Sequence, residues 1–196
     1  MSNYFRDYFH LINNENRSVD HLDLISISET IDKVNVNGGK IIIVGNGGSA
    51  AIASHAAIDF TKAANIPAIT FNESCLLTCF SNDYGYKHWV EKALEFYAKK
   101  NDMVILVSSS GQSENILNGA SKAKDMGLPL ITFSGFSSEN ALRKMGDINL
   151  WVNNSRYNIV EIVHQVWMLS IVDYLVENRL RSKKSENDLV MCKENL

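Results

Sequence analysis

The sequence predicts an α/β fold in which a parallel β-sheet is covered by helices on both faces. From residue 40 onward, short apolar runs without hydrophobic alternation are separated by stretches with helical periodicity. This pattern is typical of parallel strands that are buried on both sides. Two polar loops, one rich in glycine and one rich in serine, directly follow two of the apolar runs. Such loops are expected at the carboxyl ends of parallel strands, where α/β folds bind their ligands.

Two helices are expected ahead of the sheet, over residues 2–13 and about 19–36. Apolar residues recur at near-helical spacing through the second segment, and Ser18 or Asp20 is a suitable N-cap. The pair Gly38-Gly39 supplies a stop signal. This part of the chain contains no group of catalytic side chains.

Strands and helices then alternate to the end of the predicted sheet. The expected strands are Lys40–Val44, Ala68–Thr70, Met103–Val107, Leu130–Phe133 and Ile148–Val152. The expected helices between them are Ala50–Ala64, Lys87–Lys99, Ser113–Met126 and Glu139–Met145. Gly127 ends the third of these helices, because Pro129 prevents its continuation.

Both polar loops are suited to bind an anion. The first loop, residues 45–49, opens a helix, so that unpaired backbone N–H groups and the helix dipole favour a phosphate there. The second loop, residues 108–115, supplies hydroxyl and N–H groups that could surround a phosphate without any lysine. Each loop alone is equally consistent with an ordinary turn or helix cap. Together, at the ends of two strands of one sheet, they favour a phosphorylated ligand.

Three further polar groups are candidates for chemistry. His55 and Asp59 lie one helical turn apart and form either a metal-ligand or acid/base pair, or a surface hydrogen bond. Glu161 lies in an otherwise apolar segment, where a buried carboxylate is costly unless it has a function or a partner. Asn82-Asp83, in the expected turn SNDYGY, either binds sugar hydroxyls or makes an Asx-turn.

The last long helix is expected over Tyr157–Arg179. Apolar residues face nearly every direction of it, which predicts that it is buried all round and takes part in a subunit interface. Its acidic residues and His164 are too many for a membrane span. The charged remainder lacks periodicity, so we expect a single domain over residues 1–181 and a flexible tail over 182–196.

Composition bounds the class of protein. A chain of 196 residues with 45% hydrophobic residues is long enough for one domain, and a net charge of −3 argues against a broad nucleic-acid or membrane surface. Three cysteines, an odd number, suit a reducing compartment, and we expect Cys75 and Cys79 to be buried thiols. The N-terminus has charges where a signal peptide needs its apolar core. We therefore expect a soluble, cytoplasmic protein.

Four motifs in this order resemble the SIS-domain phosphosugar isomerases, and most closely the bacterial phosphoheptose isomerases: VGNGGSAAIASH, NDYGY, SSSGQSEN and VEIVH. The resemblance spans about residues 20–180. It implies a flavodoxin-like, three-layer αβα sandwich with a five-stranded parallel sheet, and a homotetramer with active sites between subunits. It also implies interconversion of sedoheptulose 7-phosphate and glycero-manno-heptose 7-phosphate, which supplies heptose for lipopolysaccharide or capsule.

The resemblance also implies roles for individual residues. The substrate-binding positions are Asn46, Gly47, Gly48, Ser49, Asn82, Asp83, Ser108, Ser109, Ser110 and Ser113. His55 matches a zinc-binding histidine, and Asp59 stands where the family has a glutamate that is both ligand and base. Glu161 stands where the family has a metal-binding glutamine, and Leu169 where it has a second zinc-binding histidine.

These departures leave several hypotheses open. In the first, an isomerase works with a rearranged set of groups, in which Asp59 or Glu161 is the base, His55 is a ligand or acid, and His164 compensates for Leu169. One divalent metal ion held by His55, Asp59 and Glu161 and a metal-free site are both consistent with the residues. In the second, a noncatalytic SIS module binds a phosphosugar or a protein partner, similar to the replication-initiator-associating proteins. In the third, the substrate is another phosphosugar, such as a hexulose phosphate.

Overall fold

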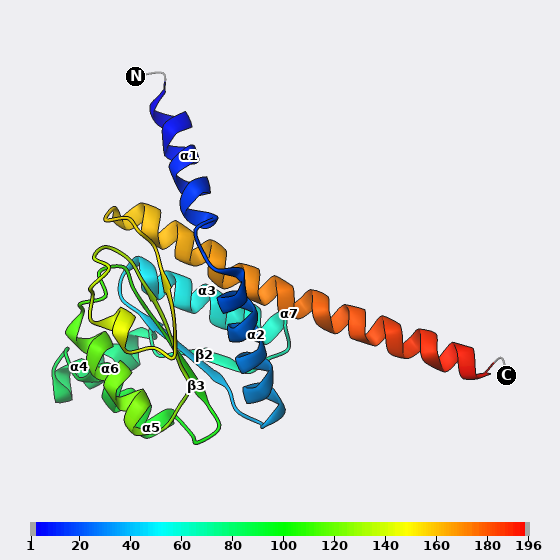
Figure 1. Ribbon diagram of the computed structural model, residues 1–196. Coiled ribbons are helices and arrows are strands. Elements are labelled where there is room, and N and C mark those ends of the chain that lie inside the picture. Colours follow the sequence, from blue (N-terminus) through cyan, green and yellow to red (C-terminus); the bar gives the residue numbers. More distant parts are fainter. Residues whose placement is uncertain (1–2, 195–196) are drawn as a thin grey trace.

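A computed structural model describes the backbone of residues 3–194 and the side chains of residues 3–181 (Figure 1). Its centre is one parallel sheet of five strands in the order β2-β1-β3-β4-β5. The strands are β1 (Ile41–Gly45), β2 (Ala68–Thr70), β3 (Met103–Ser108), β4 (Leu130–Ser134) and β5 (Ile148–Trp151). All neighbouring strands pair in parallel. The predicted sheet is therefore confirmed, with every strand boundary within one residue of its expected position.

Seven α-helices and one short 3₁₀ helix are present among the described residues. They are α1 (Tyr4–Asn16), α2 (His21–Val36), α3 (Gly48–Lys62), α4 (Ser74–Tyr84), α5 (Trp89–Tyr97), α6 (Glu114–Asp125), η1 (Leu142–Lys144) and α7 (Tyr157–Glu194). The expected helix over residues 139–145 is wrong in extent, because only the 3₁₀ turn η1 forms there. The last helix continues past its expected end to Glu194. The flexibility of residues 182–196 and the domain boundary at 181 stay predictions.

Helix α4 was not expected from the sequence. Its segment SCLLTCFSNDY is rich in Ser, Thr, Asn and Asp, which favour turns as readily as helices. The Glu73 carboxylate accepts a hydrogen bond from the Leu76 N–H at 3.0 Å and caps the helix start. Cys75 and Cys79 lie on this helix as exposed free thiols, so the expectation that they are buried is wrong. The reason is that α4 buries none of its residues.

The sheet is sandwiched between two hydrophobic cores. Ile41 and Ile43 of β1 point into one core with α2, α3 and α7, whereas Ile42 and Val44 point into the other core with α5 and α6. This alternation follows from the two-residue period of a strand. The expected three-layer αβα sandwich is therefore confirmed, with α3 and α7 lying side by side on one face of the sheet (Figure 1).

Helix α7 is the central helix of one layer. Residues 157–181 are long and apolar enough to span a membrane by composition alone. However, Val163, Trp167 and Ile171 are buried in the core with the sheet, which is how the core helix of a soluble domain packs. The prediction that the helix is buried all round is wrong for the single chain, because Ile162 and Val166 remain exposed. A stripe of apolar surface is left on the outside of α7.

A buried ion pair ties the amino ends of two central strands together. Asp102, which precedes β3, is only 2% exposed and pairs with the Lys40 ammonium group just before β1. The same carboxylate accepts hydrogen bonds from the backbone N–H groups of Lys40 at 3.0 Å and Lys99 at 2.7 Å. Because a buried charge needs such partners, this cluster fixes the edge of the sheet opposite the polar loops.

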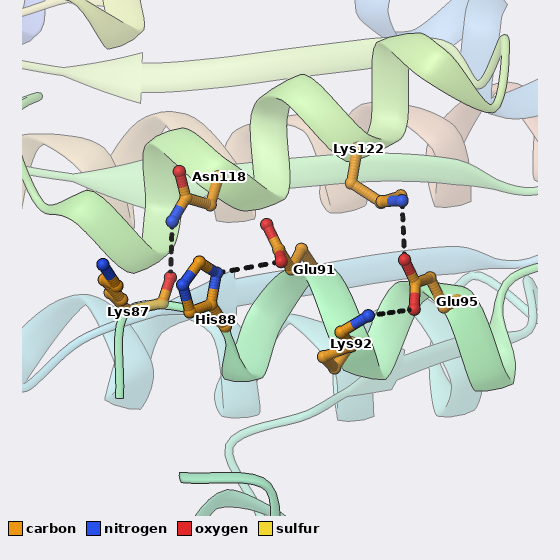
Figure 2. Close-up of polar contacts among 7 residues, drawn as sticks. All are labelled: Lys87, His88, Glu91, Lys92, Glu95, Asn118 and Lys122. Carbon is orange, nitrogen blue, oxygen red and sulfur yellow. Dashed lines mark hydrogen bonds and ion pairs between the residues drawn. The ribbon is translucent and has the colours of Figure 1, made fainter. Parts of the chain in front are cut away.

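Helices α5 and α6 pack closely on the other face. Figure 2 shows the polar contacts at their rim, where Glu95 joins Lys92 at 2.8 Å and Lys122 at 2.6 Å. In the same view, the Asn118 amide donates to the Lys87 carbonyl at 2.8 Å. Beneath this rim, Gly119 lies so near Val90 that a Cβ atom would come 2.4 Å from Val90 Cγ1. Between these two helices, the Gly119 backbone therefore lies directly against the Val90 side chain.

Candidate functional site

The carboxyl edge of the sheet carries a pocket of about 250 Å³ between the two polar loops and the start of α7. Its lining residues are Asn46, Gly47, Gly48, Ser49, Ser108, Ser109, Ser110, Ser113, Tyr157 and Glu161. The loop after β1 leads to α3 on one face of the sheet, and the loop after β3 leads to α6 on the other. The pocket therefore lies where neighbouring connections diverge, the usual ligand site of such sheets.

The start of the glycine loop is held in place by a side chain that lies just after strand β2. Asn72 follows β2, and its amide accepts from the Gly45 N–H at 3.2 Å and donates to the Gly45 carbonyl at 2.7 Å. Gly47 has a φ of +54°, a backbone conformation that residues other than glycine rarely adopt. The loop then enters α3, whose N-terminal N–H groups favour negative charge in the pocket.

The serine loop provides hydroxyl groups that are free for a ligand. Ser108 and Ser109 are each 5% exposed. The Ser109 hydroxyl is buried without a hydrogen-bond partner in the described part of the chain. Ser113, at the N-cap of α6, makes no side-chain capping bond and lies 3.5 Å from the Ser108 hydroxyl. Because an orphaned buried hydroxyl is costly, this loop fits a ligand rich in hydrogen-bond acceptors, as a phosphate is.

Glu161 brings a carboxylate to the same pocket from the first turns of α7. Its side chain lies over the start of α3, where a Cβ atom on Gly48 would come 2.2 Å from Glu161 Oε2. Partial burial raises the pKa of the Glu161 carboxyl above its ordinary value. A carboxylate in this state takes up a proton more readily than an exposed one. Of the three predicted catalytic residues, Glu161 is the one that lines the pocket.

His55 and Asp59 form a pair outside the pocket lining. The His55 Nε2 lies 3.1 Å from Asp59 Oδ2, and the Gln165 amide nitrogen lies 3.1 Å from His55 Nδ1. If the amide donates to Nδ1, the imidazole holds its proton on Nε2 and donates it to Asp59. The predicted set of three metal ligands is not assembled, because the residues with described side chains contain no group of three acidic, histidine or cysteine ligands.

The remaining predicted residues lie elsewhere. Asn82 and Asp83 lie in the helix α4, near its C-terminal end, and not in the loop turn that was expected there. The Asn82 amide donates to Asp83 Oδ1 at 2.9 Å. Neither is among the residues that line the pocket. Leu169 packs against the core beside α3, as an apolar residue does. These positions give the pocket no further polar group within this chain.

His164 does not compensate for Leu169. Its side chain is fully buried, and Nε2 lies 3.0 Å from the Ser134 carbonyl oxygen. Burial lowers the pKa of the imidazole from 6.5 to about 4. Because a carbonyl only accepts, Nε2 carries the proton and Nδ1 is left without a partner among the described side chains. His164 is therefore a neutral core residue.

Several residues of the site were missed from the sequence. Tyr157 lines the pocket and packs edge-to-face on Phe136, with 4.8 Å between the ring centroids. Asn115 and Tyr86 contact Asn46 from different elements. Asn115 is the last residue of the motif SSSGQSEN, so its position in that motif is a signal. Tyr86 is likewise the last residue of the motif NDYGY. No local pattern marks Tyr157, because tertiary packing brings it to the site.

A parallel αβα sandwich with a hydroxyl-lined pocket between two strand-end loops defines an α/β domain of the kind that binds ligands at the carboxyl ends of its strands. The sequence model of the SIS domain family matches residues 4–135, and the chain belongs to this family. Within it, the chain is 33% identical over 165 residues to the probable phosphoheptose isomerase of Thermoplasma volcanium, covering 81% of this chain and 83% of that protein. It is also 33% identical over 153 residues to the phosphoheptose isomerase of Helicobacter pylori, covering 75% and 79%.

Solved structures support the same fold. The phosphoheptose isomerase of Neisseria gonorrhoeae has a TM-score of 0.81 and 24% identity, over 89% of this chain and 95% of that one. The phosphoheptose isomerase of Francisella tularensis has a TM-score of 0.80 and 24% identity, over 90% and 96%. The predicted resemblance to the SIS-domain phosphoheptose isomerases is therefore confirmed.

Proposed function

We propose that the protein is an isomerase that interconverts sedoheptulose 7-phosphate and glycero-manno-heptose 7-phosphate. The observation that carries this proposal is the pocket, in which the carboxylate of Glu161 faces a loop of serine hydroxyls. Relatives that are 33% identical and named phosphoheptose isomerase support the reaction and the substrate. They do not favour a noncatalytic binding module.

In the proposed reaction, the serine loop binds the phosphate and the glycine loop lines the sugar. Glu161 takes the proton from the carbon beside the carbonyl, and the C–H electron pair forms the double bond of an enediolate. Glu161 returns the proton to the neighbouring carbon, while a second proton moves between the two oxygen atoms. The positive end of α3 stabilises the negative charge that develops on oxygen. The raised pKa of Glu161 suits a group that must both accept and donate a proton.

The direct test is incubation of the purified protein with sedoheptulose 7-phosphate and measurement of the aldose product. Glu161→Gln keeps the size of the side chain and removes its ability to transfer a proton. We expect kcat to fall by about 100- to 10,000-fold, the usual value of general acid–base catalysis. Glu177→Gln is the matched control, because Glu177 lies on the same helix and pairs with Arg181 at the surface.

The outcomes separate the hypotheses. Turnover that survives Glu161→Gln would remove Glu161 from the proposed reaction and leave Asp59 as the candidate base. Absent turnover of the unmodified protein, together with retained phosphosugar binding, would instead indicate the noncatalytic module. Turnover of a hexulose phosphate in preference to the heptulose phosphate would change the substrate but not the chemistry.

We keep one divalent metal ion, such as zinc, as a separate proposal. His55 and Asp59 would supply two ligands, but Glu161 does not join them within the described chain. Three protein ligands are usual for a catalytic zinc site, so no step of the reaction above depends on a metal. Metal analysis of the purified protein tests the proposal. One equivalent of zinc that is lost in His55→Ala would support it, and equal metal content in both proteins would contradict it.

We also propose a cytoplasmic homo-oligomer, a tetramer by resemblance to the family, that supplies heptose for surface polysaccharides. The support for an oligomer is the apolar surface that the single chain leaves uncovered. Phe5 and Phe9 on the outside of α1 are 70% and 64% exposed. Ile162 and Val166 extend this apolar character along α7. A second copy of the chain is the partner that would cover these side chains.

A further inference from the structure

Two asparagine side chains join the polar loops on either side of the pocket. Asn46, in the glycine loop, donates from Nδ2 to Asn115 Oδ1 at 3.0 Å. Asn115, in the first turn of α6, donates from Nδ2 to Asn46 Oδ1 at 2.9 Å. The two residues are 69 positions apart in the chain, and Asn115 is only 2% exposed. This reciprocal pair links the loop that follows β1 to the helix that follows the serine loop.

A third residue completes the contacts of Asn46. The Tyr86 hydroxyl donates to Asn46 Oδ1 at 3.1 Å, so this oxygen accepts from both Tyr86 and Asn115. An amide oxygen has two lone pairs and an amide nitrogen has two N–H groups. Both lone pairs of Asn46 Oδ1 are therefore in use, and one of its two N–H groups is engaged by Asn115. The side-chain amide of Asn46 therefore has one N–H group left for a ligand.

We propose that Asn115 is a positioning residue that fixes the amide of Asn46 as a hydrogen-bond donor to an oxygen atom of the sugar. This inference rests on the proposed function, because it assigns the phosphate to the serine loop and the sugar to Asn46. Asn46 lines the pocket, whereas Asn115 does not. Without Asn115, the Asn46 amide loses both contacts of the reciprocal pair and can rotate, so that it no longer presents a donor.

The test compares two alanine variants of the same residue type on one helix. Asn115→Ala removes the reciprocal pair. Asn118→Ala is the matched control, because Asn118 lies on α6 one turn further and donates to the Lys87 carbonyl (Figure 2). Neither Asn118 nor Lys87 lines the pocket. Two affinities are measured by calorimetry, one for inorganic phosphate and one for sedoheptulose 7-phosphate, together with kcat/KM for isomerisation.

We expect Asn115→Ala to lower kcat/KM by about 100-fold, the usual effect of displacing an active-site group by about 1 Å. The affinity for sedoheptulose 7-phosphate should fall, while that for inorganic phosphate stays within about twofold, because the hydrogen bonds of the Asn115 side chain run to Asn46 and not to the serine hydroxyls assigned to the phosphate. Asn118→Ala should leave all three quantities within about twofold. A general loss of folding would instead lower the affinity for both ligands.

Asn115→Asp provides a second variant with a readout in pH. An ionised aspartate has the shape of asparagine but cannot donate to Asn46 Oδ1, whereas a protonated one can. The ratio of variant to unmodified kcat/KM should therefore rise as the pH falls. A ratio that stays constant from pH 8 to pH 5.5 would contradict the donor role, as would an unchanged kcat/KM in Asn115→Ala.

The experiment also separates this inference from the proposed function. If the unmodified protein does not isomerise the sugar phosphate, the proposed reaction fails, and the two affinities still decide the role of Asn115. Selective loss of sedoheptulose 7-phosphate affinity in Asn115→Ala would support the positioning role. Equal losses for both ligands, or none, would overturn it.

Discussion

The contact between Gly48 and Glu161 shows how strongly the site depends on single residues. Gly48 has an ordinary helical backbone, yet a Cβ atom there would lie 2.2 Å from Glu161 Oε2 and 2.4 Å from its Cδ. The helical backbone would accept a side chain at this position, but that side chain would displace the Glu161 carboxylate above it. Because Gly48 of α3 has no side chain, the carboxylate of Glu161 on α7 has room to lie there.

We predict that Gly48→Ala damages activity without damaging the fold. Alanine is a better helix former than glycine by about 1 kcal/mol, so the unfolding free energy should not fall. The Glu161 carboxylate must move, and kcat/KM should fall by about 100-fold. In a double-mutant cycle, Gly48→Ala should have little further effect when Glu161 is already Gln. Full additivity of the two losses would refute the contact as the cause.

His164 predicts a pH dependence of stability. In the unfolded chain the imidazole binds a proton below its ordinary pKa of 6.5, whereas in the folded chain burial holds the pKa at about 4. Between these values the unfolded state binds more protons, so the unfolding free energy decreases as the pH falls. When the unfolded state binds one proton more than the folded state, the unfolding free energy changes by about 1.4 kcal/mol per pH unit, which is the largest slope that His164 can cause.

The matching measurement is urea unfolding from pH 7 to pH 5. We expect the unmodified protein to lose stability over this range and His164→Gln, which cannot titrate, to lose less. Gln also offers an amide donor for the Ser134 carbonyl in place of Nε2. Parallel pH profiles of the two proteins would show that another group is responsible.

Residues that the sequence could identify are those whose role is local. Residues from both predicted loops, 45–49 and 108–113, line the pocket, and the sequence marks them because a glycine or serine run directly after a strand is a local pattern. The pairing of Asn46 with Asn115 and the contact of His164 with the Ser134 carbonyl could not be predicted, because each joins distant elements. The same limit explains why His55 and Asp59 were grouped with Glu161 by resemblance alone.

At the scale of elements, prediction succeeded where hydrophobic pattern and length agree. The β-strands were found within one residue because each is a short apolar run that ends at a polar loop. Helix α4, which starts at the Glu73 cap, was missed because its Ser, Thr, Asn and Asp residues are equally typical of turns. Element packing, in contrast, is decided by shape, as the approach of α5 to α6 shows.

We predict that Gly119→Ala destabilises the protein although it adds a good helix former. The added methyl group would overlap Val90 Cγ1 at 2.4 Å, and overpacking of this kind costs about 1–3 kcal/mol. Most of this range exceeds the gain of about 1 kcal/mol in helix propensity. Chemical denaturation should show that Val90→Ala partly rescues Gly119→Ala. A stabilised Gly119→Ala variant would mean that the two helices separate easily.

The polar rim above this contact should matter much less. Glu95 lies at the surface between Lys92 and Lys122 (Figure 2). Exposed ion pairs contribute about 0–1 kcal/mol, so Glu95→Gln should change the unfolding free energy by less than about 1 kcal/mol. A larger loss in the same denaturation assay would indicate that the rim, rather than the Gly119 contact, holds α5 on α6.

At the scale of the whole molecule, the apolar outer faces of α1 and α7 are the surface on which the proposed homo-oligomer rests. Helix α1 projects away from the sheet and contacts α7, with its C-terminal end lying closest to that helix (Figure 1). On the inner side of α1, the Trp167 indole N–H of α7 donates to the Asn16 carbonyl at 3.1 Å. On the outer side, Phe5 and Phe9 contact only rings of their own helix among the described residues, Tyr4 at 5.5 Å and Tyr8 at 6.1 Å between ring centroids, and both remain largely exposed.

We predict that the protein is at least a dimer at micromolar concentration by light scattering. Replacing both Phe5 and Phe9 with Glu should place charge in the apolar contact and yield a smaller species. Val36→Glu is the control, because Val36 is also exposed and apolar but lies at the end of α2. A monomeric unmodified protein, or equal dissociation in the control, would contradict the assignment of this surface.

The separation of the two edges of the sheet has a consequence for engineering new substrate ranges. The Lys40–Asp102 pair anchors the amino edge, while every residue that lines the pocket lies at the carboxyl edge or at the start of α7. A mutant library confined to the pocket side would leave that anchor intact. Most members should therefore remain folded, and the limit on new specificities would be set by the two amide side chains that hold the glycine loop, Asn72 and Asn115.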